Sequence, residues 1–152
     1  VVIRSLYPHP DELLRRRWAR VMPDVADRII WVRRLQQPEF MSLLNVVDVM
    51  LDPFPYGGGV TSLEAFSFGI PLVTLPTEFL RGRITQAFCR RLGIGSCIAR
   101  DVDDYVNIAV RLGTDSAFRR QIRELILVNQ PRLFDDNSAV DAWEQFFRSV
   151  AH

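Results

Sequence analysis

The chain has 152 residues, of which 48% are hydrophobic and 24% are charged. This length and composition are those of one ordinary globular domain with a buried core, and they exclude a disordered chain. A formal net charge of +1 gives no overall field that would favour nucleic acid or an anionic membrane, and no apolar run is long enough to span a bilayer. Cys89 and Cys97 are too few for a disulfide framework or a zinc site, so we expect free thiols in the cytoplasm.

Short apolar runs alternate with amphipathic segments along the chain. The expected strands cover residues 1–3, 28–32, 46–52 and 71–76, with a weak fifth strand near 96–99. The expected helices cover about 10–22, 38–44, 61–68, 83–93, 102–112, 115–129 and 139–150. The helix at 83–93 is predicted to turn Ile84, Ala87, Phe88 and Leu92 inward. Near-continuous apolar strands that alternate with helices are typical of a parallel sheet covered on both faces. The sequence therefore predicts a doubly wound parallel sheet of the α/β class, followed by C-terminal helices.

Three glycines, Gly57 to Gly59, separate a proline-rich turn from the helix expected to begin near Thr61. Ligands of open parallel sheets bind beyond the carboxyl ends of the strands, and the free N–H groups of a helix start bind phosphate readily. Glycines would let phosphate oxygens reach that backbone. They would equally supply the positive φ angles of a strand-to-helix turn. The pattern is neither a P-loop nor a dinucleotide fingerprint, so both explanations stay open.

The neighbouring residues carry a family resemblance. The segments DVMLDPFPYGGGVTSLEAFSFGIPLVTLP (48–76), FLRGRITQAFCRRLGI (79–94) and DDYVNIAVRLGTD (103–115) closely resemble the C-terminal catalytic half of O-linked N-acetylglucosamine transferases. Their bacterial, SPINDLY-type relatives are the most similar. The likeness runs from about Arg28 to the closing LFDDNSAVDAWEQFF (133–147). It implies the Rossmann-like C-terminal half of a GT-B glycosyltransferase, which binds a nucleotide sugar, with UDP-GlcNAc as the expected donor.

The resemblance also implies a mechanism and partners. Such enzymes transfer the sugar with inversion to Ser or Thr hydroxyls of a polypeptide, and they need neither a metal nor another cofactor. We therefore expect residues 1–152 to be a nucleotide-sugar-binding domain within a longer two-domain enzyme. The N-terminal GT-B half would supply much of the acceptor side, and the general base is not in this chain. Whether tetratricopeptide repeats precede that half is left open.

The family's motif assigns residues to the donor site. Where many members carry His-Thr-Thr against the diphosphate, this chain has Gly59-Val60-Thr61. The backbone amides and hydroxyls expected to meet the diphosphate are those of Gly57, Gly58, Gly59, Val60, Thr61 and Ser62. Glu64 falls at the acidic residue that meets the ribose, and Arg83 at an arginine near the donor cleft. The base-side contacts fall at Leu35, Gln37 and Phe40, with the Phe40 ring placed to stack on the base.

Several of these assignments have a purely structural alternative. Thr61-x-x-Glu64 also matches a capping box, in which each side chain bonds the backbone N–H of the other residue. The alternative for Arg83 is a solvated arginine at a helix start, and the alternative for Phe40 is a core residue of its helix. The run Asp101-Val102-Asp103 matches the DxD pattern of metal-dependent sugar transferases, but a helix start accounts better for its acidic side chains.

Two other functions remain open beside the transferase. One is a different GT-B enzyme, which would use a GDP-sugar donor or make N-linked glucose on asparagine. The other is a non-catalytic Rossmann-like binding module. The absence of His-Thr at Gly59-Val60 favours the module, whereas Thr61, Glu64 and Arg83 favour the enzyme.

Overall fold

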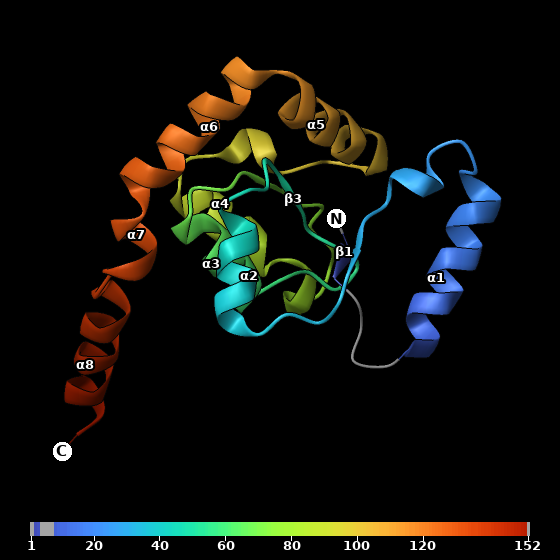
Figure 1. The fold of residues 1–152 in the computed structure, drawn as a ribbon. Helices are drawn as coiled ribbons and strands as arrows, with labels where there is room; N and C mark the ends of the chain where they lie inside the picture. Colours follow the sequence, from blue (N-terminus) through green and yellow to red (C-terminus); the bar gives the residue numbers. More distant parts are fainter. Residues whose placement is uncertain (1, 4–7, 152) are drawn as a thin grey trace. The chain divides into compact units, whose positions relative to one another are not determined.

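The computed structural model describes residues 2–3 and 8–151, and the chain divides into two compact units, Val1–Leu43 and Leu44–His152 (Figure 1). Strands and helices alternate along both units, as the sequence predicts. The elements of the first unit are β1 (Val2–Ile3), α1 (Pro8–Val21), a 3₁₀ turn (Ala26–Arg28), β2 (Trp31–Val32) and α2 (Gln37–Leu44), whose last residue belongs to the second unit. The predicted position of Val1 in the first strand lies outside the described residues.

Aromatic rings join α1 to β2 in the first unit. The Trp18 and Trp31 rings lie 5.2 Å apart between centroids, and the Arg15 guanidinium lies 4.2 Å from the Trp31 ring centroid. β1 and β2 pair in parallel, with Val2 opposite Trp31. The predicted strand at 28–32 is shortened to two residues, because Ala26–Arg28 closes a 3₁₀ turn before it.

The second unit is built on a parallel strand pair, β3 (Met50–Leu51) and β4 (Leu72–Val73). α3 (Val60–Ser67) connects the two strands, so that β3, α3 and β4 form a βαβ crossover. α4 (Ile84–Arg91) follows β4 and leads to Ile98, which forms a parallel bridge with Thr74. The weak fifth strand is therefore a single bridge. An α/β chain with parallel strands is confirmed, and the doubly wound order of the sheet stays a prediction.

Glycines follow the ends of α3 and α4. Gly69 follows α3 at φ 70° and Gly93 follows α4 at φ 73°, in the left-handed region where only glycine is free of strain. The predicted end of α3 at Gly69 is confirmed. The core that these helices cover consists mainly of Ala65, Phe66, Ile70, Leu72, Val73, Leu92, Ile94, Leu112, Ile122 and Ile126.

The two cysteines are free and fully buried in this core. Burial raises the pKa of both thiols, and that of Cys97 reaches about 12. They are therefore neutral near pH 7 and pack as small apolar side chains.

The inward face of α4 differs from the prediction. Thr85, Cys89 and Leu92 are buried, whereas Ala87 is exposed and Ile84 and Phe88 are only half-buried. Hydrophobic periodicity treats Thr85 as an outward polar residue. Because its hydroxyl finds hydrogen-bond partners inside the second unit, the helix is instead rotated to bury it.

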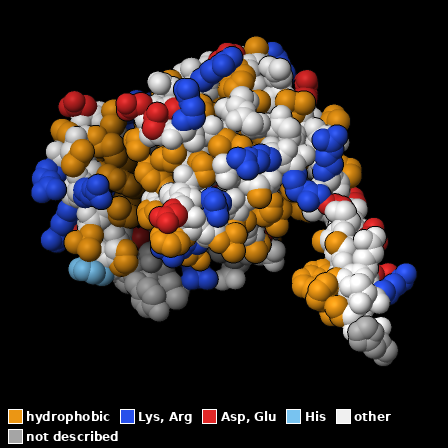
Figure 2. Space-filling model, turned by 180° about the vertical axis from the view of Figure 1, so that it is seen from behind, with side chains coloured by type: hydrophobic (Ala, Val, Ile, Leu, Met, Phe, Trp, Pro, Cys, Tyr) orange, Lys and Arg blue, Asp and Glu red, His pale blue; other side chains and the backbone are white. Residues whose placement is uncertain are grey.

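Four helices complete the second unit: α5 (Val102–Thr114), α6 (Ser116–Asn129), α7 (Pro131–Phe134) and α8 (Ser138–Val150). α6 contacts α3, α5 and α7. The short α7 is absent from the sequence prediction, because four residues carry too little periodicity to be recognised. No residue of α8 is buried, and Trp143, Phe146 and Phe147 form an exposed aromatic cluster on it (Figure 2). Within the described part of the chain, no helix has the length and apolar character needed to cross a membrane.

The core predicts a clear response to truncation of Phe66 in α3, whose side chain is fully buried. Phe66→Ala should lower the free energy of unfolding by about 3–5 kcal/mol, because it removes apolar contacts and leaves a cavity. Val128→Ala on α6 is the control, since Val128 is 77% exposed and its truncation should cost less than about 0.5 kcal/mol. Urea unfolding followed by circular dichroism measures both, and equal losses would contradict the assigned core.

Candidate functional site

The three glycines lie where a ligand site of a parallel sheet is expected, between the carboxyl end of β3 and the start of α3 (Figure 1). None of Gly57, Gly58 and Gly59 has a positive φ angle; among the described residues only Gly69 and Gly93 do. The explanation of the triplet by positive φ angles is therefore wrong.

Close packing explains two of the three glycines. A β-carbon on Gly57 would lie 2.9 Å from Asp52 Oδ2, and a β-carbon on Gly58 would collide with the Oγ atom of Ser62. Around Gly59, by contrast, a β-carbon would meet no atom within 4 Å. The interior of the protein thus requires glycine at positions 57 and 58. Only Gly59 leaves bare backbone beside open space.

A buried carboxylate holds this turn against the strands. Asp52 is 3% exposed, and its Oδ1 accepts a hydrogen bond of 2.6 Å from the Gly58 N–H. Its Oδ2 accepts a second hydrogen bond of 2.6 Å from the Thr74 hydroxyl, directly after β4. The Tyr105 hydroxyl of α5 donates to the Asp52 carbonyl at 3.0 Å. Burial, together with the nearby Asp52 charge, raises the pKa of Tyr105 to about 12.

Asp52 is a residue of the site that no sequence motif singles out. The available signal is an acidic residue at the end of an apolar strand, followed after a short turn by glycines. That signal does not say whether such a carboxylate faces a ligand or the protein's own backbone.

The start of α4 lies against the other side of the turn. Thr85 Oγ1 donates to the Gly58 carbonyl at 3.3 Å and lies 3.0 Å from Ser62 Oγ, while the Gly57 N–H donates to the Arg81 carbonyl at 2.9 Å. The predicted residue Arg83 belongs to this same segment and precedes α4 as its N-cap. Its side chain is exposed, and no partner for it occurs among the described residues. Ser62 is fully buried, so its hydroxyl faces Thr85.

The start of α3 has no side-chain cap. Its N-cap is Gly59, and Thr61 already lies within the helix, so the predicted capping box between Thr61 and Glu64 does not form. The half-buried Glu64 carboxylate has no partner among the residues that the structure describes. The amides of Val60, Thr61 and Ser62 in the first turn likewise have no acceptor there. This helix start has the free donors and the partial positive charge that bind an anion.

The base-side candidates belong to the first unit. Leu35 and Phe40 are half-buried, whereas Gln37 is exposed and begins α2. Glu39 beside them forms an ion pair with Arg33, which lowers the pKa of the Glu39 carboxyl. Contact between these residues and a nucleotide base stays a prediction.

The acidic run at 101–103 has a structural role. The Asp101 side chain caps α5 by accepting a 2.8 Å hydrogen bond from the Asp104 N–H. Asp104 forms an ion pair with Arg100, and the hydrogen bond from Arg100 lowers the pKa of the Asp104 carboxyl. These contacts account for the DxD pattern through helix capping.

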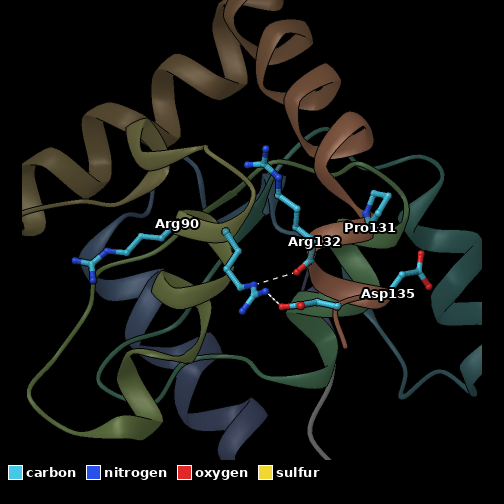
Figure 3. A pocket seen from close by; sticks show the side chains of 6 residues that line it. Arg90, Pro131, Arg132 and Asp135 are labelled. Atoms are coloured by element: carbon cyan, nitrogen blue, oxygen red, sulfur yellow. Dashed lines mark hydrogen bonds and ion pairs between the residues drawn. The ribbon is translucent and has the colours of Figure 1, made fainter. Parts of the chain in front are cut away.

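A cavity of about 540 Å³ lies between α4 and α7, and Figure 3 shows the side chains that line it. Arg91 donates to the Arg132 carbonyl at 3.0 Å and forms an ion pair with Asp136. The Arg90, Arg132 and Asp135 side chains point away from one another in this view, so they do not converge on a common ligand (Figure 3). No predicted site residue lines this cavity.

The sequence as a whole decides the family. The family model of glycosyl transferase family 41 matches residues 6–140. The chain belongs to glycosyl transferase family 41. The predicted resemblance to O-linked N-acetylglucosamine transferases is thereby confirmed.

Two curated proteins are similar to this chain over more than half of its length. The probable UDP-N-acetylglucosamine–peptide N-acetylglucosaminyltransferase SPINDLY of Hordeum vulgare is 29% identical over 118 residues, which cover 75% of this chain and 12% of that protein. The UDP-N-acetylglucosamine–peptide N-acetylglucosaminyltransferase of Caenorhabditis elegans is 34% identical over 89 residues, covering 59% of this chain and 8% of that protein. The chain thus spans a small part of the length of these relatives.

A solved structure is similar to this chain in fold. A mutant O-GlcNAc transferase of Thermobaculum terrenum superimposes with a TM-score of 0.80 at 28% sequence identity. The match covers 94% of this chain and 28% of the Thermobaculum chain.

The surroundings of the glycines predict that alanine lowers the stability of the protein at position 58 and leaves it almost unchanged at position 59. Gly58→Ala should lower the free energy of unfolding by about 1–3 kcal/mol, because its β-carbon overpacks the turn against Ser62. Gly59→Ala should be nearly neutral, since its β-carbon meets open space. Thermal unfolding of the two variants beside the wild type measures the difference, and equal losses would show that Gly59 is also constrained by packing.

Proposed function

We propose that this chain is the nucleotide-sugar-binding part of a protein O-linked N-acetylglucosamine transferase that uses UDP-GlcNAc. Membership of family 41 and the activities named for its relatives support this substrate class. The observation that carries the proposal is the uncapped start of α3, where free amides follow the bare backbone of Gly59. An anionic diphosphate is the ligand group that such a helix start binds best.

The roles of the side chains follow from their chemistry. The amides of Val60, Thr61 and Ser62 would bind the diphosphate, with Arg83 as a nearby cation. The unpaired Glu64 carboxylate would accept hydrogen bonds from the ribose hydroxyls. The base would lie against Leu35, Gln37 and Phe40 of the first unit.

The proposed reaction is an inverting displacement at the anomeric carbon. A Ser or Thr hydroxyl of the acceptor polypeptide attacks that carbon, while the bond to the UDP oxygen breaks and negative charge grows on the diphosphate. Preorganised N–H donors stabilise this charge most strongly in the transition state, which accelerates the reaction. Because these donors and Arg83 supply positive charge, we propose that no divalent ion takes part.

The proposed reaction also needs parts of the full-length protein outside residues 1–152. The N-terminal GT-B half would supply the acceptor side and the general base, and tetratricopeptide repeats are a further proposed element of the full-length protein. The two free thiols suit a reducing compartment, so we place the enzyme in the cytoplasm.

A second candidate function is nucleotide-sugar binding without transfer. It is favoured by Gly59 and Val60, because neither contributes a side-chain donor to the leaving group. A GT-B enzyme with a GDP-sugar donor or an N-linked product differs from the first proposal only in specificity. Measurements of binding and turnover with UDP-GlcNAc and GDP-sugars separate these three candidates.

The first prediction for the site concerns nucleotide binding by the full-length protein. UDP should bind with the same affinity in the presence of EDTA and of added Mg²⁺, because the proposed donors are amides and an arginine. Isothermal titration calorimetry gives the two dissociation constants. Binding that appears only with the metal would contradict the proposal, and tighter binding of GDP would favour the alternative donor.

The second prediction concerns Glu64. Glu64→Gln should weaken UDP binding by about 1–3 kcal/mol, as expected for hydrogen bonds to a charged acceptor. Its melting temperature should stay at the wild-type value, because Glu64 caps no helix. Glu124→Gln on α6 is the matched control, with an exposed carboxylate that has no role in the proposed site. A Glu64→Gln protein with wild-type affinity would remove the ribose assignment.

A further inference from the structure

Gly58 is held on both sides of its α-carbon. Its N–H donates to the buried Asp52 carboxylate at 2.6 Å, and its carbonyl accepts from Thr85 Oγ1 at 3.3 Å. The two contacts come from different places in the chain, the end of β3 and the start of α4. Neither peptide group next to the Gly58 α-carbon can rotate without breaking a part-buried hydrogen bond.

Both anchors are themselves fixed by the second unit. Asp52 is tied to Thr74 directly after β4, and its carbonyl accepts from Tyr105 of α5. Thr85 is 1% exposed and lies within hydrogen-bond distance of the buried Ser62 hydroxyl. The strands and three helices therefore converge on the backbone of one glycine.

Gly59 is held on one side only, where its carbonyl accepts a hydrogen bond of 3.1 Å from the Leu63 N–H. Open space surrounds the position of its missing β-carbon, and it directly precedes the free amides of α3. Three successive glycines would otherwise sample many backbone conformations, and a ligand would lose affinity in ordering them. Gly58 is therefore the last residue before these amides whose backbone is held on both sides.

We propose that Asp52 and Thr85 are positioning residues of the donor site. They hold Gly58 from both sides, so that the amides of Val60, Thr61 and Ser62 are presented to the diphosphate before it binds. Neither side chain touches the ligand. This inference rests on the proposed function, because it assigns the diphosphate to the start of α3.

The test uses the full-length protein with the matched pair Thr85→Val and Thr85→Ser. Valine keeps the shape of threonine and removes the hydroxyl, whereas serine retains the hydroxyl. We expect Thr85→Val to weaken UDP binding about threefold to tenfold, as for one lost hydrogen bond, and Thr85→Ser to stay within about twofold of the wild type. The Asp52→Asn protein, which keeps an acceptor for the Gly58 N–H, should bind UDP more tightly than the Asp52→Leu protein.

Two further measurements separate positioning from general stability. Ile126→Val removes a methylene group from the core on α6 and should lower the melting temperature without changing UDP affinity. Amide hydrogen exchange of residues 57–62 in the ligand-free protein should be faster in Thr85→Val than in the wild type and in Thr85→Ser. This readout needs no ligand.

The outcomes distinguish the positioning role of Thr85 from the proposed function of the site. If affinity falls in step with melting temperature in all variants, including Ile126→Val, the role of Thr85 is general stability and the inference is overturned. Unchanged exchange of residues 57–62 in Thr85→Val also overturns it. If the wild type does not bind UDP, the proposed function is wrong. In that case, faster amide exchange in Thr85→Val would still show that Thr85 holds Gly58 in place.

Discussion

The buried carboxylate of Asp52 is the interaction on which the rest of the site depends. A carboxylate that is almost fully withdrawn from water needs hydrogen-bond partners, and here the Gly58 amide and the Thr74 hydroxyl donate to it. Since one donor belongs to the turn and the other follows β4, this single group fixes the turn to the strands. It also leaves no room for a side chain on Gly57.

The glycine triplet therefore serves two separate purposes. Gly57 and Gly58 allow the turn to approach Asp52 and Ser62, which is a demand of packing. A β-carbon on Gly59 would meet no described atom within 4 Å, and the helix that Gly59 begins has first-turn amides without acceptors among the described residues. A rigid turn followed by free donors is the arrangement that electrostatic stabilisation of a leaving diphosphate requires, because donors already in place need no reorganisation as charge develops.

Family membership and local geometry support the proposed function in different ways. The match over residues 6–140 identifies the family, although the chain covers 12% of the Hordeum relative. The geometry contributes the unpaired Glu64, the exposed Arg83 and the uncapped α3. The cavity between α4 and α7 contributes nothing to the site, since the Arg90, Arg132 and Asp135 side chains that line it diverge (Figure 3).

The sequence by itself determined the alternation of strands and helices, the end of α3 at Gly69, the glycine turn after β3 and the family. These features depend on local periodicity, on the conformational freedom of glycine and on a specific motif, all of which are written in neighbouring residues. Only the tertiary structure decided that Thr85 is buried, that Thr61 and Glu64 form no capping box, and that Asp52 holds Gly58. The first and the last of these depend on partners distant along the chain: 27 residues separate Thr85 from Gly58, and 22 separate Thr74 from Asp52. Which distant groups meet is set by packing, and no local pattern encodes it.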